Sequence, residues 1–214
     1  MAPTKQRSPG KNTPSAPAPR RTQRERREST IARLLDATAD ALIELGYART
    51  TIREICVRAG VSDGGLFRHF GSRLELVAAC AEHVAERTLE DLRALADATP
   101  PTAQTPEVIV RAVRAATRHP TSYVWQELLV AARTDAELRR RIEPVTRSYV
   151  AEAQQLMTSI SGAHALTSEQ AVLWQQLLTH VFNSEAMVAA VAPDDEAEQR
   201  LVAFVTKILT DATG

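Results

Sequence analysis

Apolar residues recur at helical rather than strand spacing along most of the chain. Up to Gly46 they repeat every three or four residues, which predicts a helix that begins near Ser29 and ends at that glycine. A second, short helix is expected over residues 50–60, and Ser62 is expected to cap a third over about residues 63–70. The front of the chain is therefore predicted to hold three helices close together.

The rest of the chain predicts longer helices, most of them preceded by a capping residue. Ser72 and Thr105 stand where N-caps are expected, and Thr167 with Gln170 forms a capping-box pattern. The expected helices cover about residues 73–98, 106–119, 121–133, 135–160 and 168–191, with a last one from Pro193. No segment alternates convincingly as a strand would, so the sequence predicts an all-α fold.

The first residues differ from everything that follows. They are rich in Pro, Ser, Thr and Lys, and a segment of that composition cannot bury enough apolar surface to offset its ordering entropy. We expect a disordered arm over residues 1–28, ending in a basic cluster of Arg20, Arg21, Arg24, Arg26 and Arg27. Two interpretations stay open: a solvated leader, or an arm that contacts DNA phosphates.

Charge is distributed unevenly although the net formal charge is zero. Residues 1–75 carry 14 Lys and Arg against 8 Asp and Glu, a net +6, whereas residues 76–214 carry 12 against 18, a net −6. A basic front suggests that only this part meets a polyanion. Apolar runs are too short for a membrane span and no secretion signal is visible, so a cytoplasmic protein without a membrane partner is expected. Cys56 and Cys80 lie inside helical patterns and are expected to be buried thiols rather than a disulfide or a metal site.

The layout between residues 50 and 73 is typical of a helix-turn-helix. A short helix ends at Gly60, a tight turn follows, and a second short helix carries exposed polar groups. In such a unit the first helix braces the second, which enters the major groove of DNA. The side chains expected to form its small core are Ile52, Ile55, Val61, Leu66 and Phe70.

The same segment resembles a known family. Val61-Ser62-Asp63-Gly64-Gly65-Leu66-Phe67-Arg68-His69-Phe70-Gly71-Ser72-Arg73-Leu74-Glu75-Leu76 is similar to the signature of the TetR family of bacterial repressors, and Gly46-Tyr47 and Thr50-Thr51-Ile52 match upstream. The resemblance covers roughly residues 30–77 and implies a helix-turn-helix domain over residues 29–75. It also implies an all-helical ligand-binding and dimerisation domain over residues 76–214, and a ligand-responsive repressor that binds DNA as a homodimer.

The resemblance also implies a set of DNA contacts. Thr50, Thr51 and the capped start of the recognition helix at Ser62 are expected at phosphates. Gly64 is expected to allow close approach to DNA. The remaining positions implied at the sugar-phosphate backbone are Phe67, His69 and Arg73.

Three positions depart from the family pattern. Asp63 places a carboxylate where it repels phosphate, Gly65 has no side chain to read a base, and Phe67 lacks the tyrosine hydroxyl. Base reading is therefore assigned to Arg68 and Arg53, with the two glycines giving close backbone approach. For Arg53 the alternative is a solvated helix face.

The last two helices are expected to form the dimer face, because their apolar stripe is wider than one core contact requires. The residues assigned to it are Leu173, Leu177, Leu178, Val181, Phe182, Val188, Leu201, Phe204, Val205 and Ile208. Pairing with the symmetry mates would give a four-helix bundle, as the resemblance also implies. The alternative is that the whole stripe is intramolecular core.

The middle helices are expected to hold the effector pocket, since the family binds its ligands there. The candidates are Cys80, His83, Val84, Tyr123, Trp125, Glu127, Leu129, Tyr149 and Trp174, although each taken alone also fits plain core. The set is mainly apolar, which favours a small lipophilic or aromatic effector. No cofactor is expected.

An all-helical enzyme receives little support. The histidines are scattered without metal-ligand spacing, and no catalytic motif is visible, so neither a catalytic nor a metal site is expected. A third class stays open, an activator or architectural DNA-binding protein that lacks a ligand switch. The sequence leaves the effector, the operator, the regulated genes and the sign of regulation undetermined.

Overall fold

A computed structural model describes residues 22–98, 105–161 and 166–213 of the chain. Within these ranges the protein is helical and forms no strand, which confirms the predicted all-α fold class. The elements are α1 (Gln23–Leu45), η1 (Tyr47–Arg49), α2 (Ile52–Ala59), α3 (Asp63–Leu66), α4 (Arg73–Ala98), α5 (Pro106–Thr117), α6 (Pro120–Ala132), α7 (Ala136–Ser161), α8 (Ser168–Ala189) and α9 (Asp195–Thr213). None of these helices is long and apolar enough to cross a lipid bilayer.

The first helix begins earlier than the apolar pattern indicates. Thr22 caps α1: its side chain accepts the Glu25 N–H, and the Glu25 carboxylate accepts the Thr22 N–H at 2.8 Å. This capping box starts the helix at Gln23, so the predicted start near Ser29 is wrong and residues 22–28 are not part of a disordered arm. The first turns bury no side chain, which is why apolar periodicity missed them. Residues 1–21 of the predicted arm lie outside the described residues.

The other predicted caps are confirmed. Ser72 Oγ accepts the Glu75 N–H at 3.1 Å, Thr105 accepts the Val108 N–H, and Thr167 and Gln170 form the expected capping box. The recognition helix is shorter than predicted. α3 ends at Leu66 rather than Phe70, and residues 67–69 form turns. Two of its four residues are glycines, which weaken a helix by about 1 kcal/mol each relative to alanine.

One apolar core joins the short helices α2 and α3 to the long helices. It contains buried residues of α1, α2, α3, α4, α6 and α7, among them Leu34, Ile55, Leu66, Leu76 and Leu128. Ile52 and Val61, which were predicted to lie in a small helix-turn-helix core, pack against it half-buried. The core runs across the predicted domain boundary at residue 75, because the first turns of α4 pack into it.

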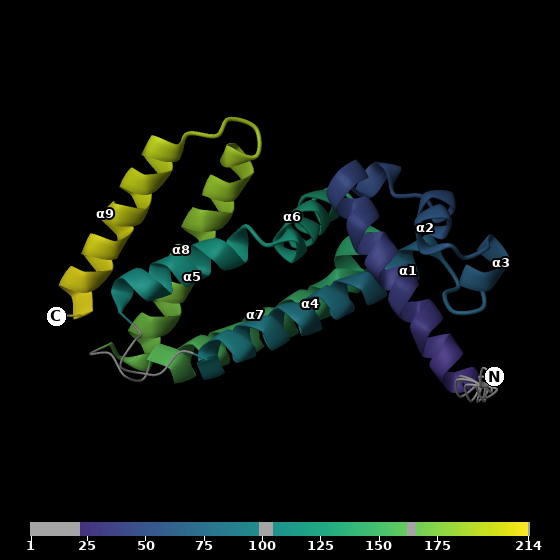
Figure 1. Cartoon of the computed structure of the whole chain (residues 1–214), viewed down its shortest axis with the longest axis horizontal. Coiled ribbons are helices and arrows are strands. Elements are labelled where there is room, and N and C mark those ends of the chain that lie inside the picture. Colours follow the sequence, from purple (N-terminus) through teal and green to yellow (C-terminus); the bar gives the residue numbers. More distant parts are fainter. Residues whose placement is uncertain (1–21, 99–104, 162–165, 214) are drawn as a thin grey trace, which may run out of the picture.

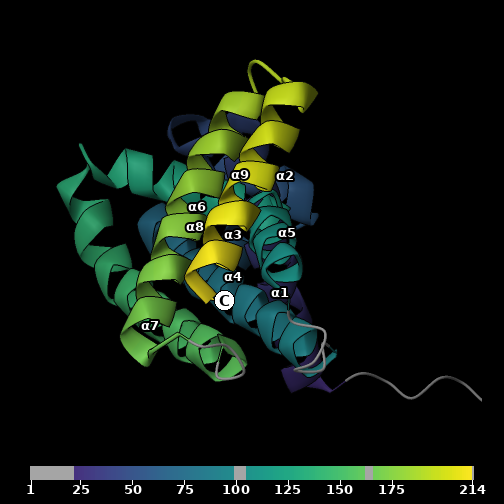
Figure 2. The same ribbon diagram turned by 90° about the vertical axis from the view of Figure 1, so that its left-hand side faces the viewer.

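A second core lies at the other end of the chain. Phe182 and Leu178 of α8 pack with Val110 of α5 and Val205 and Leu209 of α9. In Figure 1 this group occupies one end of an elongated molecule, and α2 and α3 occupy the opposite end. Seen from the α8–α9 end, α5, α8 and α9 stand in front of the rest (Figure 2).

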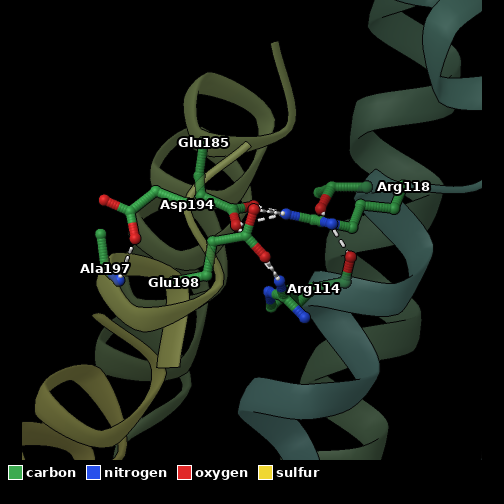
Figure 3. A network of polar contacts seen from close by, with 7 residues as sticks. Arg114, Arg118, Glu185, Asp194, Ala197 and Glu198 are labelled. Carbon is green, nitrogen blue, oxygen red and sulfur yellow. Dashed lines mark hydrogen bonds and ion pairs between the residues drawn. The ribbon is translucent and has the colours of Figure 1, made fainter. Parts of the chain in front are cut away.

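A four-residue ion network fastens α5 to α8 and α9 beside the second core (Figure 3). Arg114 contacts Glu185 at 3.2 Å and Glu198 at 2.6 Å, and Arg118 contacts the same carboxylates at 2.5 and 2.9 Å. The two glutamate side chains are only 10% and 13% exposed. The acidic side chains raise the pKa of Arg118, chiefly through its hydrogen bond with Glu185.

Candidate nucleic-acid interface

Two short helices joined by a tight turn form the predicted helix-turn-helix. Thr51 caps α2 by accepting the Glu54 N–H at 3.2 Å. Gly60 ends the helix in the left-handed region with φ of 62°, a conformation that glycine adopts without strain. Ser62 Oγ then accepts the Gly65 N–H at 3.1 Å and starts α3. The sequence thus sets both ends of the turn through local hydrogen bonds.

Exposed basic side chains lie on both helices of this unit. Arg53 on α2 and Arg68 just after α3 are exposed, and neither forms an ion pair within the part of the chain that the structure describes. Arg58 differs, because Glu44 and Glu54 hold its guanidinium at 2.8 and 2.9 Å and its pKa is raised chiefly by the Glu44 hydrogen bond. Two arginines are therefore left on the outer surface to meet a polyanion.

The two glycines of α3 have different reasons to be glycine. A Cβ added at Gly65 would lie 2.8 Å from Val61 Cγ1 and 3.3 Å from Ser62 Oγ, so internal packing opposes a side chain there. A Cβ added at Gly64 would meet no atom within 4 Å, and the residue is exposed. Nothing inside the described protein requires glycine at position 64, which fits the predicted close approach of DNA.

The two adjacent threonines before α2 are not equivalent. Thr51 is exposed at the helix start, where a phosphate contact is possible. Thr50 is completely buried, and its hydroxyl donates to the Gly46 carbonyl at 2.8 Å. The predicted phosphate contact of the Thr50 side chain is therefore wrong, because its hydroxyl is already used to fix the turn after α1.

Arg73 also faces inward. Its Nε donates to the Thr50 carbonyl at 2.5 Å, its Nη2 donates to the Tyr47 carbonyl, and its guanidinium lies 4.2 Å above the Tyr47 ring. The predicted role of Arg73 as an outward phosphate anchor is corrected by these contacts. The side chain instead ties the start of α4 to the segment that leads into α2.

The remaining predicted contacts lie at the same surface. Phe67 is 52% exposed, and its apolar ring faces solvent. His69 is half-buried, and its Nδ1 is enclosed without a partner in the described chain. A contact from this ring to the DNA sugar-phosphate backbone would therefore have to use Nε2. Burial foremost, with the Asp63 carboxylate second, raises the pKa of the Cys56 thiol to about 11.

The first turns of α1 extend this basic surface. Figure 1 shows the N-terminal half of α1 projecting on the side of α2 and α3. Arg24 pairs with Glu28 at 2.8 Å, whereas Arg26 and Arg27 are exposed and form no ion pair among the described residues. The basic cluster found in the sequence is therefore partly helical rather than part of a loose arm.

A polar junction connects the helix-turn-helix to α6 and α7. The Tyr47 N–H donates to Glu127 Oε1 at 2.5 Å, and the Tyr47 hydroxyl donates to Asp135 Oδ2 at 3.2 Å. The pKa of Asp135 is lowered chiefly by the backbone N–H of Leu138, and that of Tyr47 is raised chiefly by burial. Sequence reasoning assigned Glu127 to the effector pocket and missed its partner, because the two residues are 80 positions apart.

The predicted effector residues do not come together in one pocket. Cys80, Val84 and Trp125 are buried in the first core, and Trp125 stacks on Tyr149 with ring centroids 5.3 Å apart. His83 contacts Asp36 at 3.2 Å, Leu129 is 47% exposed, and Trp174 packs against the second core. Helical periodicity identified a shared face but not which neighbour each side chain meets. Of the set, Tyr123 and Glu127 line one surface hollow together.

The predicted dimer residues divide into two groups. Leu178, Phe182 and Val205 are buried in the second core of the protomer, and Val181 and Leu201 pack half-buried against it. The assignment of the first three to a dimer interface is therefore wrong. The others are exposed by 39–62% on α8 and α9: Leu173, Leu177, Val188, Phe204 and Ile208.

Comparisons with known proteins agree with this geometry. Residues 34–80 match the family described as bacterial regulatory proteins, tetR family. An uncharacterised HTH-type transcriptional regulator of Mycobacterium tuberculosis is 37% identical over 190 residues, which cover 89% of this chain and 97% of that protein.

Solved structures share the fold. A transcriptional regulator from Rhodococcus sp. Rha1 superposes with a TM-score of 0.65 at 19% identity, over 86% of this chain and 97% of its own. The regulator FadR of Bacillus subtilis, solved in complex with stearoyl-CoA, superposes with a TM-score of 0.58 at 16% identity, over 86% and 99% of the two chains. With the family match at the helix-turn-helix and a relative similar over nearly its whole length, the chain belongs to the TetR family of bacterial transcriptional regulators.

Proposed function

We propose that this regulator is a repressor that binds an inverted-repeat DNA operator as a homodimer and leaves it when a small, largely apolar effector binds. The observation that carries the proposal is the outer surface of the helix-turn-helix, where exposed Arg53 and Arg68 flank the side-chain-free Gly64. Arginine is the side chain that most often reads guanine edges in the major groove. A protein backbone with no side chain at its nearest point can approach DNA closely.

The homodimer is supported by the apolar face of α8 and α9. Leu177 and Phe204 are 51% and 62% exposed, and large exposed apolar side chains that gather on one face are typical of an interface. A two-fold axis through this face would relate two identical helix-turn-helix units. Two identical reading surfaces demand two identical half-sites, hence an inverted repeat.

The chemical nature of the proposed effector is inferred from the hollows of the helical domain that follows the helix-turn-helix. One of its hollows, between α1, α6 and α8, is lined mainly by apolar side chains with a few polar groups, as small-molecule sites usually are, whereas the hollow between α4 and α7 is lined largely by charged side chains. The fold neighbour that binds stearoyl-CoA shows only that such an all-helical domain can hold a ligand with a long apolar part. A largely apolar effector follows for this chain as part of the proposal.

The other reading is an activator or architectural protein without a ligand switch. The proposed repressor and this alternative would use the same DNA-binding surface, so DNA binding alone does not distinguish between the two functions. Loss of operator binding on addition of an effector would support the repressor, and occupancy that no effector changes would favour the alternative.

The test is to sequence the genomic DNA fragments that the purified full chain retains. We expect one inverted-repeat motif, bound by one dimer per site. A promoter assay with that motif should show lower transcription when the protein is present. Retention without any shared motif, or higher transcription, would contradict the proposal.

A further inference from the structure

A surface hollow of about 450 Å³ lies where α1, α6 and α8 meet. Its lining comes from Leu42 and Ile43 of α1, Tyr123, Gln126, Glu127 and Val130 of α6, and Met187 of α8. Most of this lining is apolar, and Ile43, Val130 and Met187 remain 38–50% exposed. The hollow has the size and composition of a site for one small amphipathic molecule.

Glu127 is the one charged side chain among the described residues that line the hollow. It is half-buried, and it accepts a hydrogen bond from a neutral donor, the Tyr47 N–H, at 2.5 Å. A carboxylate has about four acceptor positions, so most of its hydrogen-bonding capacity is left over. Glu127 forms no ion pair within the described ranges of the chain, so it gains from a cationic ligand group, because charge-assisted hydrogen bonds are roughly twice as strong as neutral ones.

We propose that this hollow binds a small cationic amphiphile, with its ammonium group on Glu127 and its apolar body against Leu42, Ile43 and Met187. A carboxylate ligand would be repelled by Glu127, and a neutral alcohol would gain only an ordinary hydrogen bond. The binding site stands on the geometry alone. Its regulatory consequence rests on the proposed function as a ligand-responsive regulator.

The consequence follows from what else Glu127 holds. The carboxylate lies against the turn after α1, since a Cβ built on Gly46 would be 3.0 Å from Oε1. An ammonium group bound at the remaining acceptor positions draws the carboxylate toward the hollow and so weakens its hydrogen bond with the Tyr47 N–H. The Arg73 guanidinium lies over the Tyr47 ring and also donates to the Thr50 carbonyl. Thr50 comes one residue before Thr51, which caps α2. A ligand that pulls Glu127 from Tyr47 therefore loosens the segment that orients the helix-turn-helix.

Matched probes test the charge preference of the hollow. Calorimetric titration of the full chain would compare 4-phenylbutylamine, 4-phenylbutanol and 4-phenylbutanoate, which share one apolar body. We expect the amine to bind at least about tenfold more tightly than the alcohol, and the carboxylate to bind weakest. Equal affinity of the amine and the alcohol would overturn the proposal.

Two variants locate the binding. Glu127→Gln removes the charge but keeps an oxygen that accepts the Tyr47 N–H, so the fold should hold while the amine preference is lost. Glu137→Gln, at an exposed glutamate in the first turn of α7, is the matched control and should keep the preference. An amine preference that survives in Glu127→Gln would place the binding elsewhere and overturn the proposal.

Hydrogen exchange and DNA binding separate the site from the proposed function. In the wild-type chain the amine should speed exchange of the Tyr47 amide and leave that of core residue Cys80 unchanged, and it should weaken operator binding. Absence of any specific operator would defeat the proposed function yet leave the amine preference and the Tyr47 response as support for the site. Specific DNA binding without amine preference would defeat the site alone.

Discussion

Three arginines of the helix-turn-helix region look alike in the sequence and differ in the structure. Arg53 and Arg68 are exposed, whereas Arg73 donates to the Thr50 and Tyr47 carbonyls. A side chain's direction depends on the tertiary contact it finds, and Arg73 finds the ring of Tyr47, which lies 26 positions earlier in the chain. The family pattern supplied its position but not its partners.

This difference predicts opposite effects of two substitutions. Arg73→Met leaves two carbonyls without their donor and should lower the free energy of unfolding by about 1–3 kcal/mol. Arg68→Ala should change it by less than about 0.5 kcal/mol, because the side chain is exposed, yet cost about 1–3 kcal/mol on the operator. Urea unfolding and a DNA-binding titration measure both quantities. A stable Arg73→Met protein would show that the inward contacts carry little energy.

The adjacent glycines give a matched pair of the same kind. Gly64→Ala meets no neighbour and should raise the free energy of unfolding by about 0.4–1 kcal/mol, since alanine restricts the unfolded chain. It should also weaken operator binding, because the added methyl group lies on the DNA-facing side. Gly65→Ala forces Val61 to shift and should instead lower stability. Unchanged operator affinity of Gly64→Ala would remove the argument for close approach at this position.

At the level of elements, the sequence predicts what local chemistry decides. Ser72, Thr105 and the pair Thr167 and Gln170 cap helices as expected, because a cap depends on neighbours within three residues. The true start of α1 carried the same signal in Thr22 and Glu25, but it precedes the first buried residue and was masked by the basic composition around it. Local signals were therefore sufficient for these three caps, but not for the start of α1 or the end of α3.

Contacts between helices could not be derived in this way. The apolar stripe of α8 is wide enough for two partners, yet its periodicity does not say that Leu178 and Phe182 face α5 while Leu173 and Leu177 face outward. The junction of Tyr47 with Glu127 was likewise invisible, because it depends on how α6 crosses the end of α1. The scattered effector residues are the largest error of this type.

The ion network on α5 gives a prediction at this scale. Glu185→Ala leaves Arg114 and Arg118 facing each other with one carboxylate instead of two, and breaking such a poorly exposed network should cost about 3 kcal/mol. Glu196→Ala, at an exposed glutamate that pairs with exposed Arg200, should cost less than about 1 kcal/mol. Thermal unfolding measures the difference. Equal melting temperatures of the two variants would show that the second core alone holds α5 on α8 and α9.

In the whole molecule, the helix-turn-helix and the proposed dimer face on α8 and α9 lie at opposite ends (Figure 1). The basic front and acidic rear found in the sequence fit this division, because DNA phosphates would repel an acidic surface placed close to them. α4 and α7 run the length between the two ends, and the first core joins them to α1 and α2. In the proposed dimer, a change at the junction of α1 and α6 would reach the helix-turn-helix of its own protomer directly and that of the partner only through the dimer face.

The dimer can be tested through the salt dependence of DNA binding. Leu177→Glu together with Phe204→Glu buries charge in the proposed interface and should give a monomer by light scattering at micromolar concentration. The control is Val150→Glu on α7, at a residue 43% exposed and outside the proposed face, which should stay dimeric. Each protomer releases counterions from its own phosphate contacts, so the slope of log affinity against log salt should fall to about half in the monomer. A double variant that remains a dimer would show that another surface joins the two protomers. A monomer that keeps the full slope would show that one protomer alone supplies the DNA contacts.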